Sequence, residues 1–228
     1  MRRTFVVSAL LAAALLMKGI TTGLAAQLND NEQPPALARF LTTVEQGPAS
    51  YQAMRRLEVR NRRLSEAAWM HVRTEADAGG FRYRVVGEGG SGYVRDRLFV
   101  PALETEQKMW GAGDKGALTL DNYTFEDRGA ESSGLAWIGV TPRRKDVLLV
   151  TGSIFLRPDD GDLVRVEGAL SRTPSFWTRN VEIVRTYERI GGVRVPVRLE
   201  STASVRIAGT STFTMTYEYE SINGKAVE

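Results

Sequence analysis

Apolar and polar residues alternate with a period of two through much of the C-terminal third of the chain. In Val193–Val205, valine, leucine and small residues occupy every second position, and arginine, glutamate and threonine recur between them. Ser211–Tyr219 repeats the pattern, with threonine and glutamate at the intervening positions. Strict alternation over this length predicts strands with one buried and one solvated face, and therefore an antiparallel sheet.

Turn residues separate the alternating stretches at short intervals. Asp159–Asp162 lies between Val147–Arg157 and Leu163–Leu170, and Gly191 with Gly192 precedes the long stretch described above. Such turns between alternating segments predict consecutive β-hairpins rather than strand–helix–strand crossovers.

Two segments have helical rather than strand-like patterns. Pro35–Gly47 predicts a short amphipathic helix, with proline in its first turn and glycine at its end. Tyr93–Trp110 is rich in helix formers but contains Pro101, so it predicts either one helix broken near Pro101 or a loop followed by a helix. The predicted class is mainly β (α+β), with one strongly curved antiparallel sheet covered by these two segments.

The N-terminus has the features of a secretory signal peptide. Arg2 and Arg3 precede the apolar run Phe5–Met17, which is shorter than the roughly 20 residues that span a bilayer. It matches the apolar region of a signal peptide, and Gly23–Ala26 supplies small residues for cleavage. We expect residues 1–26 to be removed near Ala26, leaving one periplasmic domain, residues 27–228. An uncleaved N-terminal anchor is the alternative.

Composition excludes several classes of function. The chain has 30 Lys and Arg against 27 Asp and Glu, and Arg2, Arg3 and Lys18 of the leader account for the excess. The remainder is formally neutral, which gives no support to nucleic-acid binding. The absence of cysteine excludes disulfides, thiolate metal sites and a lipid-modified cysteine, and the single histidine, His71, excludes multi-histidine zinc sites. We therefore expect no metal and no cofactor.

Three motifs with chemical potential have simpler interpretations. Gly87–Gly92 matches G-x-G-x-x-G, but the strand before it alternates arginine with apolar residues, unlike a buried parallel strand, so a flexible loop leading to a mobile helix is favoured. Asp159–Asp162 lacks EF-hand spacing and is a hairpin turn. His71 has no accompanying G-x-S-x-G nucleophile signature, which favours a structural role. We expect a protein that is not an enzyme.

Aromatic and large apolar side chains are frequent in the half-buried strands and the central helical segment. A wide curved sheet with two short helices predicts a partly open apolar pocket that binds an acyl chain or another lipid. A dry core beneath the helices is the alternative. The predicted cavity and lid residues are Trp69, Phe81, Tyr83, Leu98, Phe99, Leu103, Trp110, Trp137, Phe155, Trp177, Phe213 and Tyr217.

Four segments carry a resemblance to a known superfamily: Asn122–Glu126, Gly152–Gly168, Pro174–Arg179 and Tyr187–Pro196. In the order leader, amphipathic helix, first strands, glycine segment, interrupted helix and long antiparallel run, the chain resembles the periplasmic lipoprotein carriers. These are the LolA- and LolB-like proteins of outer-membrane lipoprotein sorting.

The resemblance implies an incomplete β-barrel, capped by helices, with an apolar cavity for lipoprotein acyl chains. It further implies a monomeric, non-enzymatic carrier whose helix lid is held by a basic residue, for which Arg95 and Arg97 are candidates. An envelope protein partner would load or receive the cargo. Two alternatives stay open: an envelope protein-interaction or sensor module with a filled core on the same fold, and an envelope hydrolase.

Overall fold

The computed structural model describes residues 34–43, 45–61, 66–110, 116–173, 178–205 and 209–228. The predicted leader and Trp177 lie outside these residues. In the part of the chain that the structure describes, eleven strands form one sheet. Their bounds are β1 Tyr51–Asn61, β2 Glu66–Asp77, β3 Gly80–Gly90, β4 Tyr123–Ala130, β5 Ala136–Pro142, β6 Val150–Leu156, β7 Leu163–Leu170, β8 Thr178–Ile190, β9 Val193–Val205, β10 Gly209–Ile222 and β11 Lys225–Ala226.

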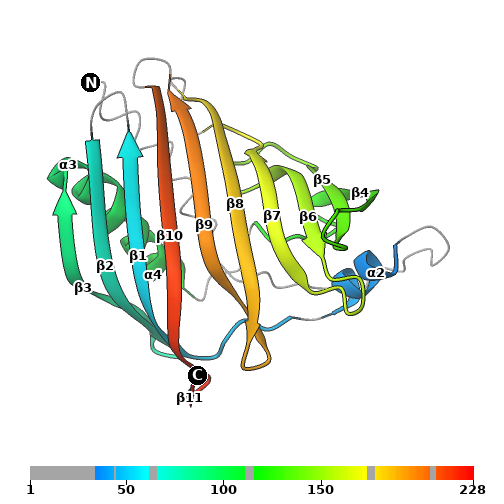
Figure 1. Cartoon of the computed structure of the whole chain (residues 1–228), viewed down its shortest axis with the longest axis horizontal. Helices are drawn as coiled ribbons and strands as arrows, with labels where there is room; N and C mark the ends of the chain where they lie inside the picture. Colours follow the sequence, from blue (N-terminus) through cyan, green and yellow to red (C-terminus); the bar gives the residue numbers. More distant parts are fainter. Residues whose placement is uncertain (1–33, 44, 62–65, 111–115, 174–177, 206–208) are drawn as a thin grey trace.

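The sheet is antiparallel throughout and open, with β3 and β4 at its two ends (Figure 1). The strand order is β3-β2-β1-β10-β9-β8-β7-β6-β5-β4, and β11 pairs with β10. All neighbours but one are consecutive in the chain. The exception is the pairing of β1 with β10, in which Leu57 lies opposite Met215. The predicted mainly β class, with one large antiparallel sheet that does not close, is confirmed.

The predicted hairpins are confirmed, but the prediction for the glycine segment is wrong. The β6–β7 and β8–β9 hairpins turn at Asp159–Asp162 and at Gly191 with Gly192, as expected. Gly87–Gly90, however, belongs to β3 and pairs with β2, so the predicted loop is wrong there. The indole ring of Trp69 lies against Gly87 and Gly89, and a Cβ at Gly89 would lie only 2.5 Å from its Nε1. Glycine thus serves ring packing rather than loop mobility.

Two helical segments cover one face of the sheet. α2 (Pro35–Thr42) ends earlier than the predicted Gly47, because Thr43 is extended and its hydroxyl bonds the carbonyl of Arg39. The second segment comprises α3 (Gly92–Val94), the π-helical turn η1 (Arg95–Phe99) and α4 (Val100–Met109), and we call it the central helix. Within the described residues, no helix is long and apolar enough to cross a membrane.

Pro101 interrupts the hydrogen bonding of the central helix without breaking it. The N–H of Val100 bonds the carbonyl of Arg95, which is the i→i+5 pattern of a π turn. Pro101 has no N–H and follows this widened turn directly, as the second residue of α4. Of the two predicted alternatives, one interrupted helix is therefore the nearer description.

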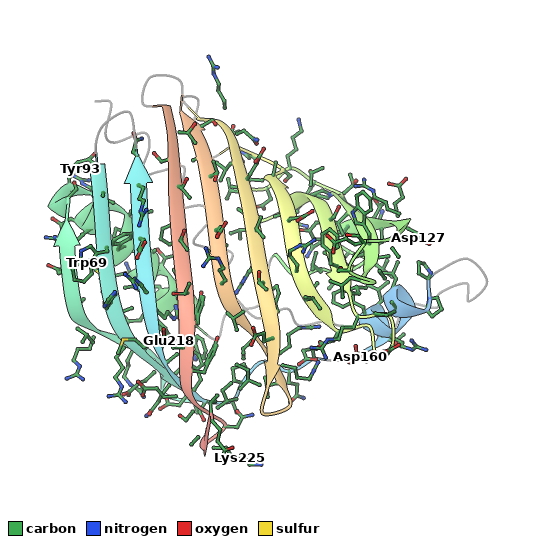
Figure 2. The ribbon with its side chains drawn as sticks, in the orientation of Figure 1. Trp69, Tyr93, Asp127, Asp160, Glu218 and Lys225 are labelled. Carbon is green, nitrogen blue, oxygen red and sulfur yellow. The ribbon has the colours of Figure 1, made fainter. Side chains whose placement is uncertain are left out.

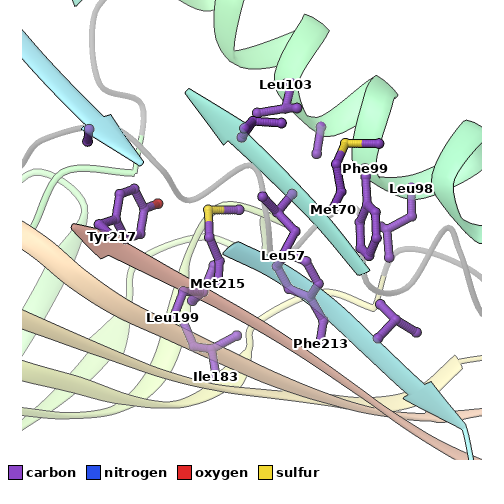
Figure 3. Packing of buried hydrophobic residues seen from close by; sticks show 14 of the residues in the cluster. Leu57, Met70, Leu98, Phe99, Leu103, Ile183, Leu199, Phe213, Met215 and Tyr217 are labelled. Atoms are coloured by element: carbon purple, nitrogen blue, oxygen red, sulfur yellow. The ribbon is translucent and has the colours of Figure 1, made fainter. Parts of the chain in front are cut away.

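Two core clusters lie on the helix-covered side, which we call the inner face. The first joins the central helix to β1, β2, β9 and β10, and Figure 3 shows Leu98, Phe99 and Leu103 facing Leu57, Met70 and Phe213. The second joins Leu37 and Phe40 of α2 to β4–β7. The opposite side of the sheet, the outer face, carries the alternate polar residues of the same strands.

A pair of glycines lets β6 and β7 approach closely between the two clusters. Gly152 lies directly opposite Gly168. A Cβ added to Gly152 would lie 2.1 Å from the carbonyl oxygen of Glu167. This obstacle is backbone rather than a flexible side chain, so only a shift of the whole strand would relieve it.

We predict that Gly152→Ala lowers the free energy of unfolding by about 1–3 kcal/mol, because the added methyl forces the strands apart. Gly47→Ala is the matched control, since a Cβ there meets nothing within 4 Å, and it should change stability by no more than about 0.5 kcal/mol. Urea unfolding followed by circular dichroism measures both. Equal stabilities for the two variants would contradict the close approach.

Candidate functional site

The interface between the central helix and the inner face of the sheet is apolar on both sides. Val94, Leu98, Phe99, Ala102 and Leu103 on the helix are at most 5% exposed. They pack on Leu57, Met70, Val72, Phe213 and Met215 of the strands, all buried in the same cluster. The rings of Phe99 and Phe213 have centroids 6.1 Å apart. This interface is where most of the predicted ligand site lies.

The π turn determines which helix side chains reach the sheet. A turn closed by an i→i+5 hydrogen bond holds one residue more than an α turn. Val94 and Phe99, five residues apart, therefore both face the strands, and Leu98 does so beside Phe99. In α4 the same face continues through Ala102, Leu103 and Glu106, which are all buried.

A buried ion pair joins the helix to the sheet at this face. Arg55 on β1 donates through Nη1 to Glu106 Oε2 (2.7 Å) and through Nη2 to Glu106 Oε1 (3.0 Å). The side chains of Arg55 and Glu106 are only 2% and 7% exposed. Nη2 also donates to the hydroxyl of Tyr51. The pair is bidentate, the geometry in which a guanidinium binds a carboxylate most strongly.

Aromatic rings enclose the Arg55 guanidinium. Its Cζ lies 4.7 Å from the ring centroid of Tyr217 and 5.1 Å from that of Phe81. Both rings belong to the predicted site residues. Cation–π contacts of this kind stabilise a guanidinium that has lost its water. The site thus combines an apolar interface with one compensated charge at its edge.

Burial shifts the titration of the groups around Arg55. It raises the pKa of Tyr51 and of Tyr217 above the usual tyrosine value, although the Arg55 charge opposes the shift. Burial alone would lower the pKa of Arg55, but the carboxylate of Glu106 and the hydroxyls of Tyr51 and Tyr217 together more than offset it, so the net shift is upward. The guanidinium therefore keeps its charge, and both tyrosines stay neutral, over the whole physiological range.

The predicted residues separate into two groups. Phe81, Leu98, Phe99, Leu103, Phe213 and Tyr217 are brought together beneath the central helix, with Tyr83 and Trp110 packed at the margin of the same cluster. Trp69 and Trp137 are 39% and 36% exposed on the outer face, and Phe155 stacks on Trp137 there, so these three do not line the inner site.

The alternation of side chains along a strand explains why these three residues lie on the outer face. Trp69 lies between Ala68 and Met70, which are both buried on the inner face. Phe155 lies in the same way between Ile154 and Leu156 of the second cluster. Because successive side chains in a strand point to opposite faces, an aromatic between two inward residues points outward.

Arg55 was missed by the sequence analysis, which considered Arg95 and Arg97 for the basic residue that holds the helix. Arg95 bonds the carbonyl of Gly90 on β3, and Arg97 is exposed. The alternation in β1 could have identified Arg55, because it is a charged residue at an inward-facing position between Ala53 and Leu57. Glu106 likewise falls on the buried face of α4.

A different set of ion pairs fixes the α2 end of the sheet. Arg189 contacts Glu45 (2.9 Å), which follows α2, and Asp162 (2.7 Å) of the β6–β7 turn. Arg194 contacts the same Asp162 at 3.3 Å. Asp162 therefore forms ion pairs with two arginines, which leaves its carboxylate unsuited to bind a metal ion. Groups of three or more potential metal ligands are absent among the described residues.

No protein-family model matches the chain, and no curated protein matches it. Two crystal structures have a similar fold. A DUF1329 family protein from Desulfovibrio piger has a TM-score of 0.44 and 10% identity, over 80% of this chain and 88% of that one. A LolA superfamily protein from Nitrosomonas europaea has a TM-score of 0.41 and 9% identity, over 80% and 91%. At this identity the likeness concerns the fold alone.

The ion pair gives a prediction about stability. Glu106→Gln leaves a charged guanidinium buried without its carboxylate, and we expect the free energy of unfolding to fall by about 3–5 kcal/mol. Arg55→Leu combined with Glu106→Leu removes both charges and should recover most of that loss. A double-mutant cycle by urea unfolding, made of Arg55→Leu, Glu106→Leu and their combination, measures the coupling. A double variant no more stable than Glu106→Gln would contradict the assignment.

Proposed function

We propose that the protein is a non-enzymatic carrier of the periplasm, which holds the acyl chain of a lipoprotein or another lipid against the inner face of its sheet. The bound chain would replace the central helix on Leu57, Met70 and Phe213. The observation that carries the proposal is the apolar helix–sheet interface closed by the Arg55–Glu106 pair.

The energies of helix packing and lipid binding are of comparable size. Uncovering Leu98, Phe99 and Leu103 would cost about 1.5–3 kcal/mol for each side chain. An acyl chain gains about 0.8 kcal/mol for each buried CH₂, so about six to eleven such groups would offset that cost. The free energies of the two apolar contacts are therefore close to balanced, before the separation of the Arg55–Glu106 pair is counted, and such a balance suits a carrier that must both load and release.

The side chains that would meet the cargo are adaptable. Met70 and Met215 lie in the first core cluster beneath the helix. Methionine is unbranched and polarisable, so it repacks around ligands of different shape. His71, by contrast, lies on the outer face beside Trp69, with ring centroids 4.9 Å apart, and is remote from this interface.

A second function on the same fold is favoured by the tightness of the packing. Leu98, Phe99 and Leu103 are fully buried, which is also what a filled core would give. An envelope protein-interaction or sensor module would keep this core closed and bind its protein partner at the surface. The two proposals differ in whether the central helix leaves the sheet.

A covalent lock on the central helix distinguishes them. Gln107 on α4 is exposed and donates to the carbonyl of Phe81, next to the exposed Arg82 on β3. The chain has no cysteine, so Gln107→Cys with Arg82→Cys can be joined by a short bis-maleimide without side reactions. We expect native mass spectrometry to detect bound palmitate before cross-linking and to find uptake abolished after it.

The matched control joins Glu75→Cys to the same Arg82→Cys. These positions are opposite each other on β2 and β3, so this cross-link spans the sheet without touching the helix. It should leave palmitate uptake unchanged. Uptake that survives the helix cross-link, or an unlocked protein that binds no lipid at all, would overturn the carrier and favour the interaction module.

A further inference from the structure

A polar groove of about 850 Å³ runs along β10 on the outer face, away from the acyl site. Its floor consists of four threonines at alternate positions: Thr210, Thr212, Thr214 and Thr216. Its walls are the longer side chains of the neighbouring strands, Arg56, Glu58 and Arg60 on β1 and Arg198 on β9. The groove exists because a strand with short side chains lies between two strands with long ones.

The strand register orders the groups along this groove. Thr216 pairs with Arg56 on one side and with Arg198 on the other. Thr214 pairs in the same way with Glu58 and Glu200. Each wall therefore presents a guanidinium and then a carboxylate at matching levels. Because β1 and β9 both neighbour β10, the wall backbones are about 9.5 Å apart, and Thr210–Glu218 extends about 27 Å.

The charges of each wall are already paired along their own strand. Arg56 Nε lies 2.6 Å from Glu58 Oε1, and Arg198 contacts Glu200 in the same i, i+2 relation. The groove thus has donors and acceptors in alternation and little net charge. The residues that line it carry three guanidiniums (Arg56, Arg60 and Arg198) and two carboxylates (Glu58 and Glu218). A polyanion would therefore meet carboxylates among the guanidiniums, and an apolar chain would meet polar groups throughout.

An aromatic platform adjoins the β1 wall. A second hollow of about 340 Å³ shares Arg56, Glu58 and Arg60 with the groove and is also lined by Trp69 and His71. Figure 2 shows Trp69 at the β2–β3 end of the sheet, and Glu218 on β10. The Trp69 ring is 39% exposed and rests on Gly87 and Gly89 of β3. Those glycines allow a broad ring to lie along the sheet surface.

We propose that this groove binds a neutral, extended glycan strand. Sugar hydroxyls both donate and accept, so they match a floor of threonine hydroxyls between alternating guanidinium and carboxylate groups. The electron-rich face of an exposed indole attracts the polarised C–H groups of a sugar ring. A long, narrow groove of little net charge suits an extended polymer of such rings rather than a single ion.

This site does not depend on the acyl carrier function. The groove residues alternate along the strands with residues of the inner core: Thr212 and Thr214 with Phe213 and Met215, and Glu58 with Leu57. Glycan and lipid would therefore occupy opposite faces of the same strands. Such a protein could be retained at a glycan layer while its inner site stays accessible to lipid.

The test is isothermal titration calorimetry of the purified protein with cellohexaose, chitohexaose and maltohexaose. Dextran sulfate serves as the polyanion. Thr212→Val with Thr214→Val removes two hydroxyls from the floor while keeping side-chain shape and strand propensity. We expect at least one neutral glycan to bind, and this double variant to weaken it about tenfold, as the loss of two hydrogen bonds implies. Trp69→Ala should weaken it severalfold.

Thr151→Val is the matched control, since Thr151 is exposed on β6, outside the groove, and it should bind as the unaltered protein does. The proposal is overturned if no neutral glycan binds, if Thr212→Val with Thr214→Val leaves binding unchanged, or if only dextran sulfate binds. Palmitate uptake measured on the same samples reports the inner site separately.

Discussion

The charge of Arg55 is the constraint on which the arrangement of the inner face depends. A guanidinium that is 2% exposed cannot be hydrated in place, so it requires a carboxylate at the same depth. Glu106 supplies that carboxylate, but only when α4 lies on β1 with its apolar side chains inward. The ion pair and the hydrophobic contact are therefore made together, by the same docked position of α4.

The two covers of the inner face are held in different ways. α2 lies over β4–β7, and beside it the β6–β7 turn, β8, β9 and Glu45 are tied together by Arg189 and Arg194. The central helix packs on apolar side chains and relies on Arg55, with lesser polar contacts from Arg95 and Gln107 to β3.

Most of the fold follows from local sequence, and the functional details follow from pairing across the sheet. The alternation in β9 and β10 predicted both strands because each residue's face is determined by its neighbours. The pairing of β1 with β10 joins residues far apart in the chain and has no local signal. The same limitation hid the Arg55–Glu106 pair, whose members are brought together only by docking of the helix. The outward positions of Trp69 and Trp137 were misjudged because aromatic character was considered before strand parity.

The most direct test of the account is the distance between the central helix and the sheet, with and without lipid. Spin labels at Lys108→Cys on α4 and Glu182→Cys on β8, both exposed positions in a chain without cysteine, allow that distance to be measured by double electron–electron resonance. The account predicts a single short distance in the lipid-free protein and a second, longer one that grows as palmitate is added. Bound palmitate with an unchanged distance distribution would contradict it.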